Sequence, residues 1–160
     1  MRVKTGLGQD SHRFASQNQN KPLILGGIKF PEPLSLIGNS DADVVLHALT
    51  NAISSITGVN VIGELSDRLC LQQGITNSQV YLQEALGYLP PWQLSHVALS
   101  IEAKTPKITP KINEMKHNVA QLLGLASEDI GITATSGEGL TAFGRGEGIQ
   151  VLCIVTAWHH

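Results

Sequence analysis

The chain has 160 residues, of which 42% are apolar and 15% charged, and its formal net charge at pH 7 is −2. This length is typical of one ordinary domain, and this composition is typical of a chain that buries a sizeable core rather than of a disordered one. The slightly negative charge argues against broad nucleic-acid binding, because such binding needs a basic surface. We therefore expect one domain over residues 1–160, with no nucleic-acid partner.

Targeting signals are not recognisable in the sequence. No apolar run approaches the roughly 20 residues of a transmembrane helix. The opening segment, MRVKTGLGQDSHRF, lacks the apolar centre of a signal peptide. The two cysteines, Cys70 and Cys153, lack metal-type spacing and are interpreted as reduced, buried thiols. These features predict a soluble protein that is not secreted and has no membrane partner.

The apolar pattern predicts a mixture of strands and helices without strict alternation. Gly26-Gly27 predicts a turn between two short strands, and Ser40 or Asp41 is available to cap the helix that follows. In chain order, the predicted elements are strands within 2–9 and 23–30, helices over 41–57 and 77–89, a strand over 96–102, a helix from 109 to 124, and strands over 130–134 and 148–157.

This mixture predicts an α/β fold in which one mixed sheet is covered by helices on one face. A sheet whose other face stays bare needs a second subunit to cover it. We therefore expect an oligomer.

Asp10-Ser11-His12 is the first group that can carry chemistry. On a strand, residues two apart point to the same side, so Asp10 and His12 would project together as two ligands of one metal. The alternative is a surface turn that contains two polar residues. Taken alone, the tripeptide favours the surface turn, because D-x-H is common.

Residues 39–47, NSDADVVLH, place polar residues at a helix entrance and His47 one turn inside it. Asp43 and His47 share a helix face, so Asp43 is predicted to orient His47 from behind. A lone histidine among apolar neighbours is more often a core residue than a ligand, but Asp10 and His12 supply a matching partial site. Two histidines and one carboxylate make a tetrahedral zinc site with one open position, which is the catalytic pattern.

Two glycine-rich segments follow, ATSGEG at 134–139 and GRGEG at 144–148. Their backbone N–H groups can approach a phosphate, and nearby hydroxyls and a carboxylate suit a diphosphate with a hard cation such as magnesium. The alternative is a pair of flexible hairpin turns. Lys107 precedes a helix start, where it either contacts a phosphate or is simply solvated.

Together and in this order, these groups resemble the 2-C-methyl-D-erythritol 2,4-cyclodiphosphate synthase family of the non-mevalonate isoprenoid pathway. The similarity runs from Met1 to about Ala157. It is carried by G-x-D-x-H at 8–12, S-D-x-D-V-x-L-H-A-L at 40–49, Thr105-Pro106-Lys107 and G-R-G-E-G-I at 144–149.

The resemblance implies a homotrimer with active sites between neighbouring subunits and one sheet face toward the trimer axis. It implies a phosphorus–oxygen lyase that acts on 4-diphosphocytidyl-2-C-methyl-D-erythritol 2-phosphate. The 2-phosphate attacks the β-phosphorus in line, and 2-C-methyl-D-erythritol 2,4-cyclodiphosphate and CMP result. One Zn2+ per subunit and one Mg2+ or Mn2+ on the diphosphate are implied as cofactors.

Residue roles carry over from matching positions. Asp10, His12 and His47 would hold zinc, Glu138 would face magnesium, and Asn39 and Ser136 would act on the reacting phosphates. Ala103, Lys107 and Ile108, with Ala134 and Thr135 of a neighbouring subunit, would surround the cytidine. Arg145 and Glu147 match residues that line the trimer axis, where family members can hold an isoprenoid diphosphate. The implied substrate contacts are Asp10, His12, Asn39, Ser40, Val61, Gly63, Ala103, Lys107, Ile108, Ala134, Thr135, Ser136, Glu138 and Arg145.

Two departures from the family pattern stand on the sugar side of the site. Asn39 replaces a histidine, and Val61 replaces the aspartate that holds the erythritol hydroxyls in the family. Losing one acceptor for a hydroxyl costs about 1–3 kcal/mol. Asp67 or Glu64, which are close in sequence, are predicted to supply the missing carboxylate.

These departures leave an alternative from another class, a zinc-stabilised trimer that binds an isoprenoid diphosphate or a partner protein with lost or weak turnover. A generic nucleotide-binding module would explain residues 144–148 but not Asp10, His12 and His47. The zinc ligands and Ser136 favour the enzyme. We expect it in the bacterial cytoplasm, or in the plastid stroma if the source is of plant type.

Overall fold

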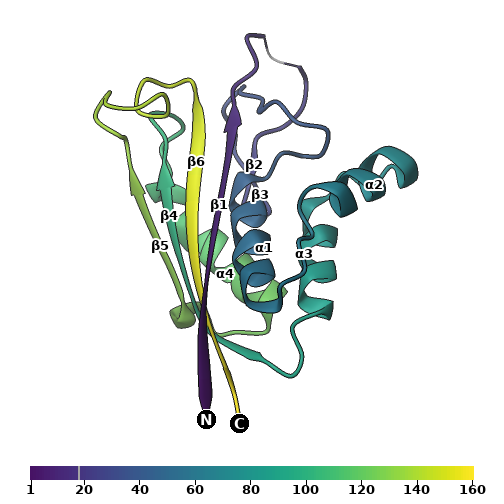
Figure 1. Cartoon of the computed structure of the whole chain (residues 1–160). Helices are drawn as coiled ribbons and strands as arrows, with labels where there is room; N and C mark the ends of the chain where they lie inside the picture. The colour runs from purple at the N-terminus through teal and green to yellow at the C-terminus, as the bar shows by residue number, and fades with distance from the viewer. Residues whose placement is uncertain (18) are drawn as a thin grey trace.

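A four-stranded mixed sheet forms one layer of the molecule, seen in a computed structural model that describes residues 1–17 and 19–160 (Figure 1). The strand order is β1-β6-β4-β5, with antiparallel β1/β6 and β6/β4 pairs and a parallel β4/β5 pair. The two long strands β1 and β6 pair along their whole length. The strand bounds are β1 Arg2–Arg13, β4 Gln93–Glu102, β5 Ile130–Thr135 and β6 Gly148–His159.

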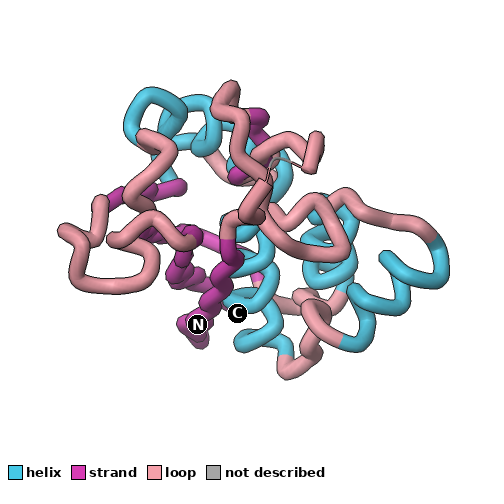
Figure 2. Tube along the Cα trace, turned by 90° about the horizontal axis from the view of Figure 1, so that it is seen from above, coloured by secondary structure: helices cyan, strands magenta, loops and turns pink. Residues whose placement is uncertain are grey.

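The helices all lie on one side of this sheet, as the view from above shows (Figure 2). Helix α1 contacts β1 and β6, α3 packs against α1, and α4 contacts β5. The remaining elements are a small hairpin and two short 3-10 turns. The bounds are β2 Ile24–Leu25, β3 Ile28–Lys29, α1 Val44–Thr57, α2 Glu64–Gln73, α3 Ser78–Gly87, α4 Ile112–Leu123, and 3-10 turns at Thr109–Lys111 and Ser127–Asp129.

Two glycines let α1 lie directly on the backbone of β1. A Cβ at Gly6 would come within 2.2 Å of the Ala52 carbonyl oxygen, and one at Gly8 within 2.1 Å of the Ala48 carbonyl oxygen. Real side chains do not approach a backbone oxygen so closely, so only glycine fits at these positions. This close approach brings the far end of β1 next to the first turn of α1, where His47 lies.

Asp43 is the N-cap of helix α1, so the predicted cap at Ser40 or Asp41 is wrong. The Asp43 carboxylate accepts from the N–H groups of Leu46, Gly26 and Gly27 at 3.0, 2.9 and 2.7 Å. Complete burial raises the pKa of Asp43 to about 6, against the lowering effect of these three donors. Asp43 therefore joins the β2–β3 turn to the start of α1, and both turn glycines have the positive φ that a tight hairpin requires.

The predicted mixed sheet with helices on one face is confirmed, and most predicted elements are present with small changes at their ends. Helix α2 was not predicted. Its sequence, ELSDRLCLQQ, is mostly polar, and Ser66 and Cys70 are its buried residues. A helix with so narrow an apolar stripe gives little periodic signal.

The opposite face of the sheet exposes several large apolar side chains. Val3 and Leu7 of β1 are 58% and 61% exposed, and Leu152 and Ile154 of β6 are 41% and 45% exposed. Leu7 and Ile154 are direct cross-strand partners and Leu152 lies two residues from Ile154 on the same face, so these three form one apolar patch. Val3 lies on the same face beyond the Thr5/Thr156 pair. Among the described residues, the structure has no helix long and apolar enough to cross a membrane.

Candidate metal centre and active site

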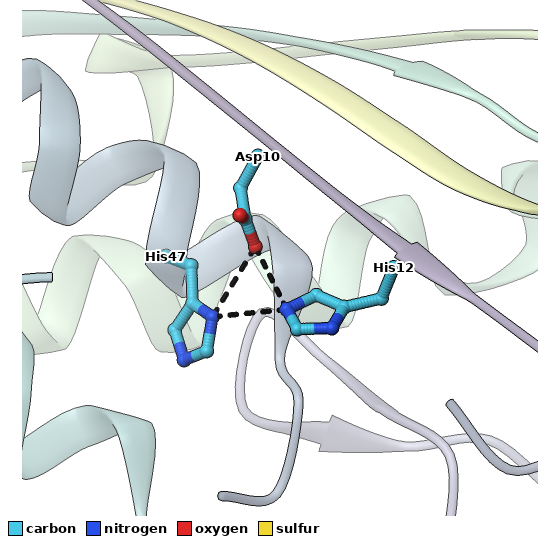
Figure 3. A group of neighbouring side chains, drawn as sticks. All are labelled: Asp10, His12 and His47. Atoms are coloured by element: carbon cyan, nitrogen blue, oxygen red, sulfur yellow. Dashed lines mark hydrogen bonds and ion pairs between the residues drawn. The ribbon is translucent and has the colours of Figure 1, made fainter. Parts of the chain in front are cut away.

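Asp10, His12 and His47 converge on one point between β1 and the first turn of α1 (Figure 3). Asp10 Oδ2 lies 3.0 Å from His12 Nε2 and 3.2 Å from His47 Nδ1, and these two nitrogens are 3.3 Å apart. One atom from each residue thus faces the other two, as the sequence predicted for a shared ligand set. Alternation along β1 places Asp10 and His12 on the same side, toward α1.

His12 has its second ring nitrogen fixed by the backbone. Nδ1 lies 2.7 Å from the carbonyl oxygen of Ile37. A carbonyl oxygen only accepts, so Nδ1 carries the proton and Nε2 presents its lone pair to the cluster. This tautomer is the one that a metal ligand needs.

His47 has its second ring nitrogen next to Ser78, at the start of α3. The distance from Nε2 to Ser78 Oγ is 2.7 Å, and the Ser78 hydroxyl donates to Asp41 Oδ1. The prediction that Asp43 orients His47 is wrong, because the Asp43 carboxylate accepts from the backbone N–H groups of Gly26, Gly27 and Leu46. Two residues that the sequence analysis did not assign to the site, Ser78 and Asp41, occupy that place instead.

The charges of Asp10 and His12 support each other. Burial alone would raise the pKa of Asp10, but hydrogen bonds from His12 and His47 outweigh it, and the pKa is lowered. Burial alone would lower the pKa of His12, but the hydrogen bond and the charge of Asp10, together with the Ile37 carbonyl, outweigh it, and that pKa is raised. Without a cation, a proton on the cluster therefore balances the charge of the Asp10 carboxylate. A metal ion would take the place of that proton.

The cluster opens into a pocket of about 280 Å3. Asn39, Ser40 and Gly63, which the sequence assigned to the substrate, line it, and Asp67 lines it as well. The full lining is Asp10, His12, Gly38, Asn39, Ser40, His47, Ile62, Gly63, Ser66, Asp67, Cys70 and Tyr81.

Val61 does not belong to this pocket, which corrects its predicted role in binding the substrate. Its side chain is fully buried in the hydrophobic core, while the following residues Ile62 and Gly63 reach the pocket. Of the two carboxylates predicted to replace the missing acceptor, Asp67 lines the pocket. Glu64 lines a separate groove on α2, together with Asp67 and Arg68.

Two side chains that sequence reasoning missed hold the 38–40 loop at the pocket rim. Lys21 Nζ donates to the carbonyls of Gly38 and Ser40 at 3.1 and 3.2 Å, and Cys70 Sγ donates to the Asn39 carbonyl at 3.2 Å. Burial lowers the pKa of Lys21. Neither contact has a sequence signal, because both join residues far apart in the chain.

A second pocket of about 370 Å3 lies where β4 and β5 end. It gathers the residues that the resemblance assigned to cytidine, and Ser136 with them. All come from one chain, so the predicted division of this group between two subunits is wrong. The lining is Ala103, Lys104, Pro106, Lys107, Ile108, Thr109, Pro110, Ala134, Thr135 and Ser136.

In the glycine-rich segment after β5, Ser136 and Glu138 do not line the pocket of Asp10, His12 and His47, whereas Phe143 and Glu147 line a neighbouring pocket together with His12. Glu138 is exposed, has a φ of 53°, and donates its N–H to Ser136 Oγ at 3.3 Å. Arg145 Nε and Arg13 Nη1 contact the two carboxylate oxygens of Glu147 at 3.2 and 3.4 Å. The residues predicted for the trimer axis thus form an exposed ion-pair group with Arg13.

The strand order separates the two pockets. Asp10 and His12 lie on β1 at one edge of the sheet, whereas Ala134 and Thr135 lie at the end of β5, the opposite edge. Asn39 and Ser136, the predicted catalytic pair, therefore line different pockets within one chain.

Comparisons with known proteins find matches over nearly the whole chain. Residues 3–158 match the model of the YgbB family. A 2-C-methyl-D-erythritol 2,4-cyclodiphosphate synthase of Chlamydia trachomatis serovar L2b is 49% identical over 154 residues, which cover 96% of this chain and 86% of the relative.

Solved structures share the fold. The bifunctional IspDF of Campylobacter jejuni superposes with a TM-score of 0.89 at 32% identity, over 99% of this chain and 43% of that longer chain. A 2C-methyl-D-erythritol-2,4-cyclodiphosphate synthase in its CDP-bound form superposes with a TM-score of 0.76 at 27% identity, over 97% of this chain and 100% of that chain.

Proposed function

This chain belongs to the YgbB family, and we propose that it converts 4-diphosphocytidyl-2-C-methyl-D-erythritol 2-phosphate to 2-C-methyl-D-erythritol 2,4-cyclodiphosphate and CMP. The observation that carries the proposal is the cluster of Asp10, His12 and His47, which opens into a pocket. Its close relatives bear the name of this synthase, and one structural neighbour holds CDP.

The donor set of the cluster fits zinc. One carboxylate oxygen and two imidazole nitrogens within 3.0–3.3 Å of each other can approach a single cation from three sides. Three protein ligands leave the fourth tetrahedral position open, as catalytic zinc sites do. We propose one Zn2+ per subunit, and Mg2+ or Mn2+ on the diphosphate near Glu138. Metal ions there would supply Lewis-acid polarisation and charge neutralisation at the phosphates.

The proposed step forms one P–O bond and breaks another. An oxygen of the 2-phosphate attacks the β-phosphorus, and the bond from that phosphorus to the oxygen bridging the α-phosphate breaks. The bridging oxygen keeps the electron pair and leaves with CMP. Both reacting groups belong to one molecule, so the main task of the protein is to orient them. Asn39 and Ser40, which line the metal pocket, and Ser136, which lines the second pocket, would hydrogen-bond phosphate oxygens.

The second pocket suits the cytidine. Its volume of about 370 Å3 lies in the usual range for small-molecule sites. Pro106 and Ile108 would supply apolar surface for the base, and the exposed Lys107 would contact a phosphate. The cytidine contacts are proposed to be Ala103, Lys107, Ile108, Ala134 and Thr135 from one subunit, next to the metal pocket of its neighbour.

A homotrimer would join the two pockets. The exposed apolar residues Val3, Leu7, Leu152 and Ile154 of the bare sheet face supply surface that an interface would bury. A ring of copies that presents the β5 edge of one sheet to the β1 edge of the next completes each site from two chains. Arg145 and Glu147 would then lie near the axis, where an isoprenoid diphosphate is the proposed ligand. Bacterial relatives favour a cytoplasmic location over the plastid.

Release of CMP tests the proposal. Purified protein with zinc and magnesium should release CMP from the cytidyl substrate and form the cyclic product, detected by 31P NMR. Chelation should stop the reaction, and added zinc should restore it. Zinc-loaded assemblies that release no CMP above background would instead support the alternative, a zinc-stabilised binding protein. Position 61 carries a fully buried valine where the family pattern has an aspartate. This missing carboxylate is the observation that supports the alternative.

A further inference from the structure

The ring nitrogen of His47 that faces away from Asp10 and His12 takes part in a series of hydrogen bonds that has no role in the proposed reaction. Ser78 is fully buried at the first turn of α3, and its Oγ lies 2.7 Å from His47 Nε2. The same hydroxyl contacts Asp41 Oδ1. The chain therefore runs from a loop carboxylate through a buried serine to a metal-facing imidazole.

The direction of each proton in this chain follows from what the groups can donate. The Asp41 carboxylate accepts from the N–H of Asp43 at 3.1 Å and from the N–H of Ser78 at 3.0 Å. Both oxygens of this carboxylate therefore act as acceptors, so the single proton of the Ser78 hydroxyl points to Asp41. The hydroxyl oxygen then presents only lone pairs to His47, and Nε2 must carry the proton that joins them.

We propose that Asp41 and Ser78 are positioning residues that hold His47 as its Nε2–H tautomer and so aim the Nδ1 lone pair at the metal. The inference rests on the metal site of the proposed function. The opposite tautomer would set a nitrogen lone pair against oxygen lone pairs at 2.7 Å in a buried place, which is unfavourable. The Ile37 carbonyl fixes the tautomer of His12 in the same way.

The hydrogen bonds from Asp41 through Ser78 to His47, called the relay from here on, also connect the metal site to the segment that carries α2 and α3. The Asp41 N–H donates to the Thr76 carbonyl at 2.9 Å, and Asp41 Oδ2 accepts from the backbone of Ser78. These contacts hold the 39–43 loop against the start of α3. A shift of α3 would therefore alter the orientation of His47 as well as the shape of the pocket beside it.

Zinc affinity tests the relay, with Ser78→Ala and Asp41→Asn as variants. Each should weaken zinc binding by about 10–100-fold, measured by competition with a chelator, because outer partners of metal-bound histidines typically have effects of this size. In Asp41→Asn the amide N–H2 can donate to Ser78, which turns the hydroxyl proton toward His47 and favours the wrong tautomer.

Additivity separates a relay from two independent contacts. If Asp41 acts through Ser78, the double variant should be weaker than the worse single variant by no more than about threefold. A second readout is the His47 Nε2–H signal in NMR spectra of the zinc-loaded protein. The signal should be protected from exchange in the wild type and lose protection in Ser78→Ala.

Two control variants address helix stability and charge. Asn77→Ala removes the α3 cap, whose Oδ1 accepts from Gln79 N at 2.9 Å, without touching the relay. Glu64→Gln removes one exposed carboxylate from α2. Both should keep zinc affinity within about twofold of the wild type, since neither contacts the relay.

The inference is overturned if both relay variants bind zinc like the wild type, if their effects simply add, or if Asn77→Ala weakens binding as much as Ser78→Ala. A wild-type protein that binds no zinc would instead contradict the metal site itself. The two failures are therefore distinguishable.

Discussion

The two pockets of this protein are built in different ways. The metal pocket joins β1, α1 and the start of α3 through side-chain hydrogen bonds, and His47 and Ser78 are almost completely buried. The second pocket, which we propose for cytidine, consists of two loop segments at the ends of β4 and β5, with exposed Lys107, Thr135 and Ser136. The first is built from side chains of one chain, and we propose that a neighbouring chain covers the second. The chemistry is thus expected to depend on assembly, and metal binding is not.

Removing one metal ligand should break the metal pocket completely. We expect His47→Ala to lose zinc, from one ion per chain to none, and to release CMP only at background rate. Two remaining ligands hold zinc too weakly to survive purification. Metal analysis of the purified variant measures this. His117→Ala, an exposed histidine on α4, is the control and should keep one zinc per chain. Full zinc in His47→Ala would show that the ligand set is wrong.

A charge on the bare sheet face should separate the two pockets without damaging either. Leu7→Lys is expected to convert the assembly to monomers, because a lysine cannot be buried unpaired in an apolar interface. CMP release should fall to background, while zinc content stays at one per chain. Light scattering coupled to gel filtration, with metal analysis, measures both. Val80→Lys, on α3, should leave assembly and activity unchanged. An active Leu7→Lys monomer would contradict the shared site.

The packing of α1 on β1 should be sensitive to one methyl group. Gly8→Ala places a Cβ 2.1 Å from the Ala48 carbonyl oxygen, so the helix has to move. We expect a loss of about 3 kcal/mol in the free energy of unfolding, measured with urea, and weaker zinc binding, since His47 lies on the same helix. Gly87→Ala, where a Cβ meets nothing within 4 Å, is the matched control. Equal stability of the two variants would rule out the close approach.

The smallest expected effect concerns Asp67, which lines the metal pocket. Asp67→Asn should raise KM about tenfold with a smaller change in kcat, because a carboxylate that accepts from a substrate hydroxyl contributes about 1–3 kcal/mol. Glu64→Gln, whose side chain lines the neighbouring groove, should leave KM unchanged. Steady-state CMP release gives both constants. If Glu64→Gln rather than Asp67→Asn raises KM, α2 presents the other carboxylate to the substrate.

Local patterns in the sequence were sufficient for the sheet, most of the helices and the three metal-facing residues. Apolar alternation gives the strands, helical spacing gives α1 and α4, and the i, i+2 pair Asp10/His12 has its geometry fixed by any strand. The glycine pair at 26–27 marks its turn because few other residues adopt positive φ.

Contacts between distant segments had no such signal. The sequence pointed to Asp43 behind His47 because four residues span one helical turn. The fold instead turns Asp43 toward the β2–β3 hairpin and brings Ser78, 31 positions away, to the ring. In the same way, Val61 occupies the core and Asp67 the pocket, because the start of α2 determines which side chains face inward.

The sequence by itself therefore determined the ligand types and their positions on β1 and α1, since these follow from the periods of a strand and a helix. Only the tertiary structure decided which groups support those ligands and that the two pockets lie at opposite edges of one sheet. The physical reason is that hydrogen-bond partners and strand order depend on how separate segments pack, and one-dimensional spacing does not encode that packing.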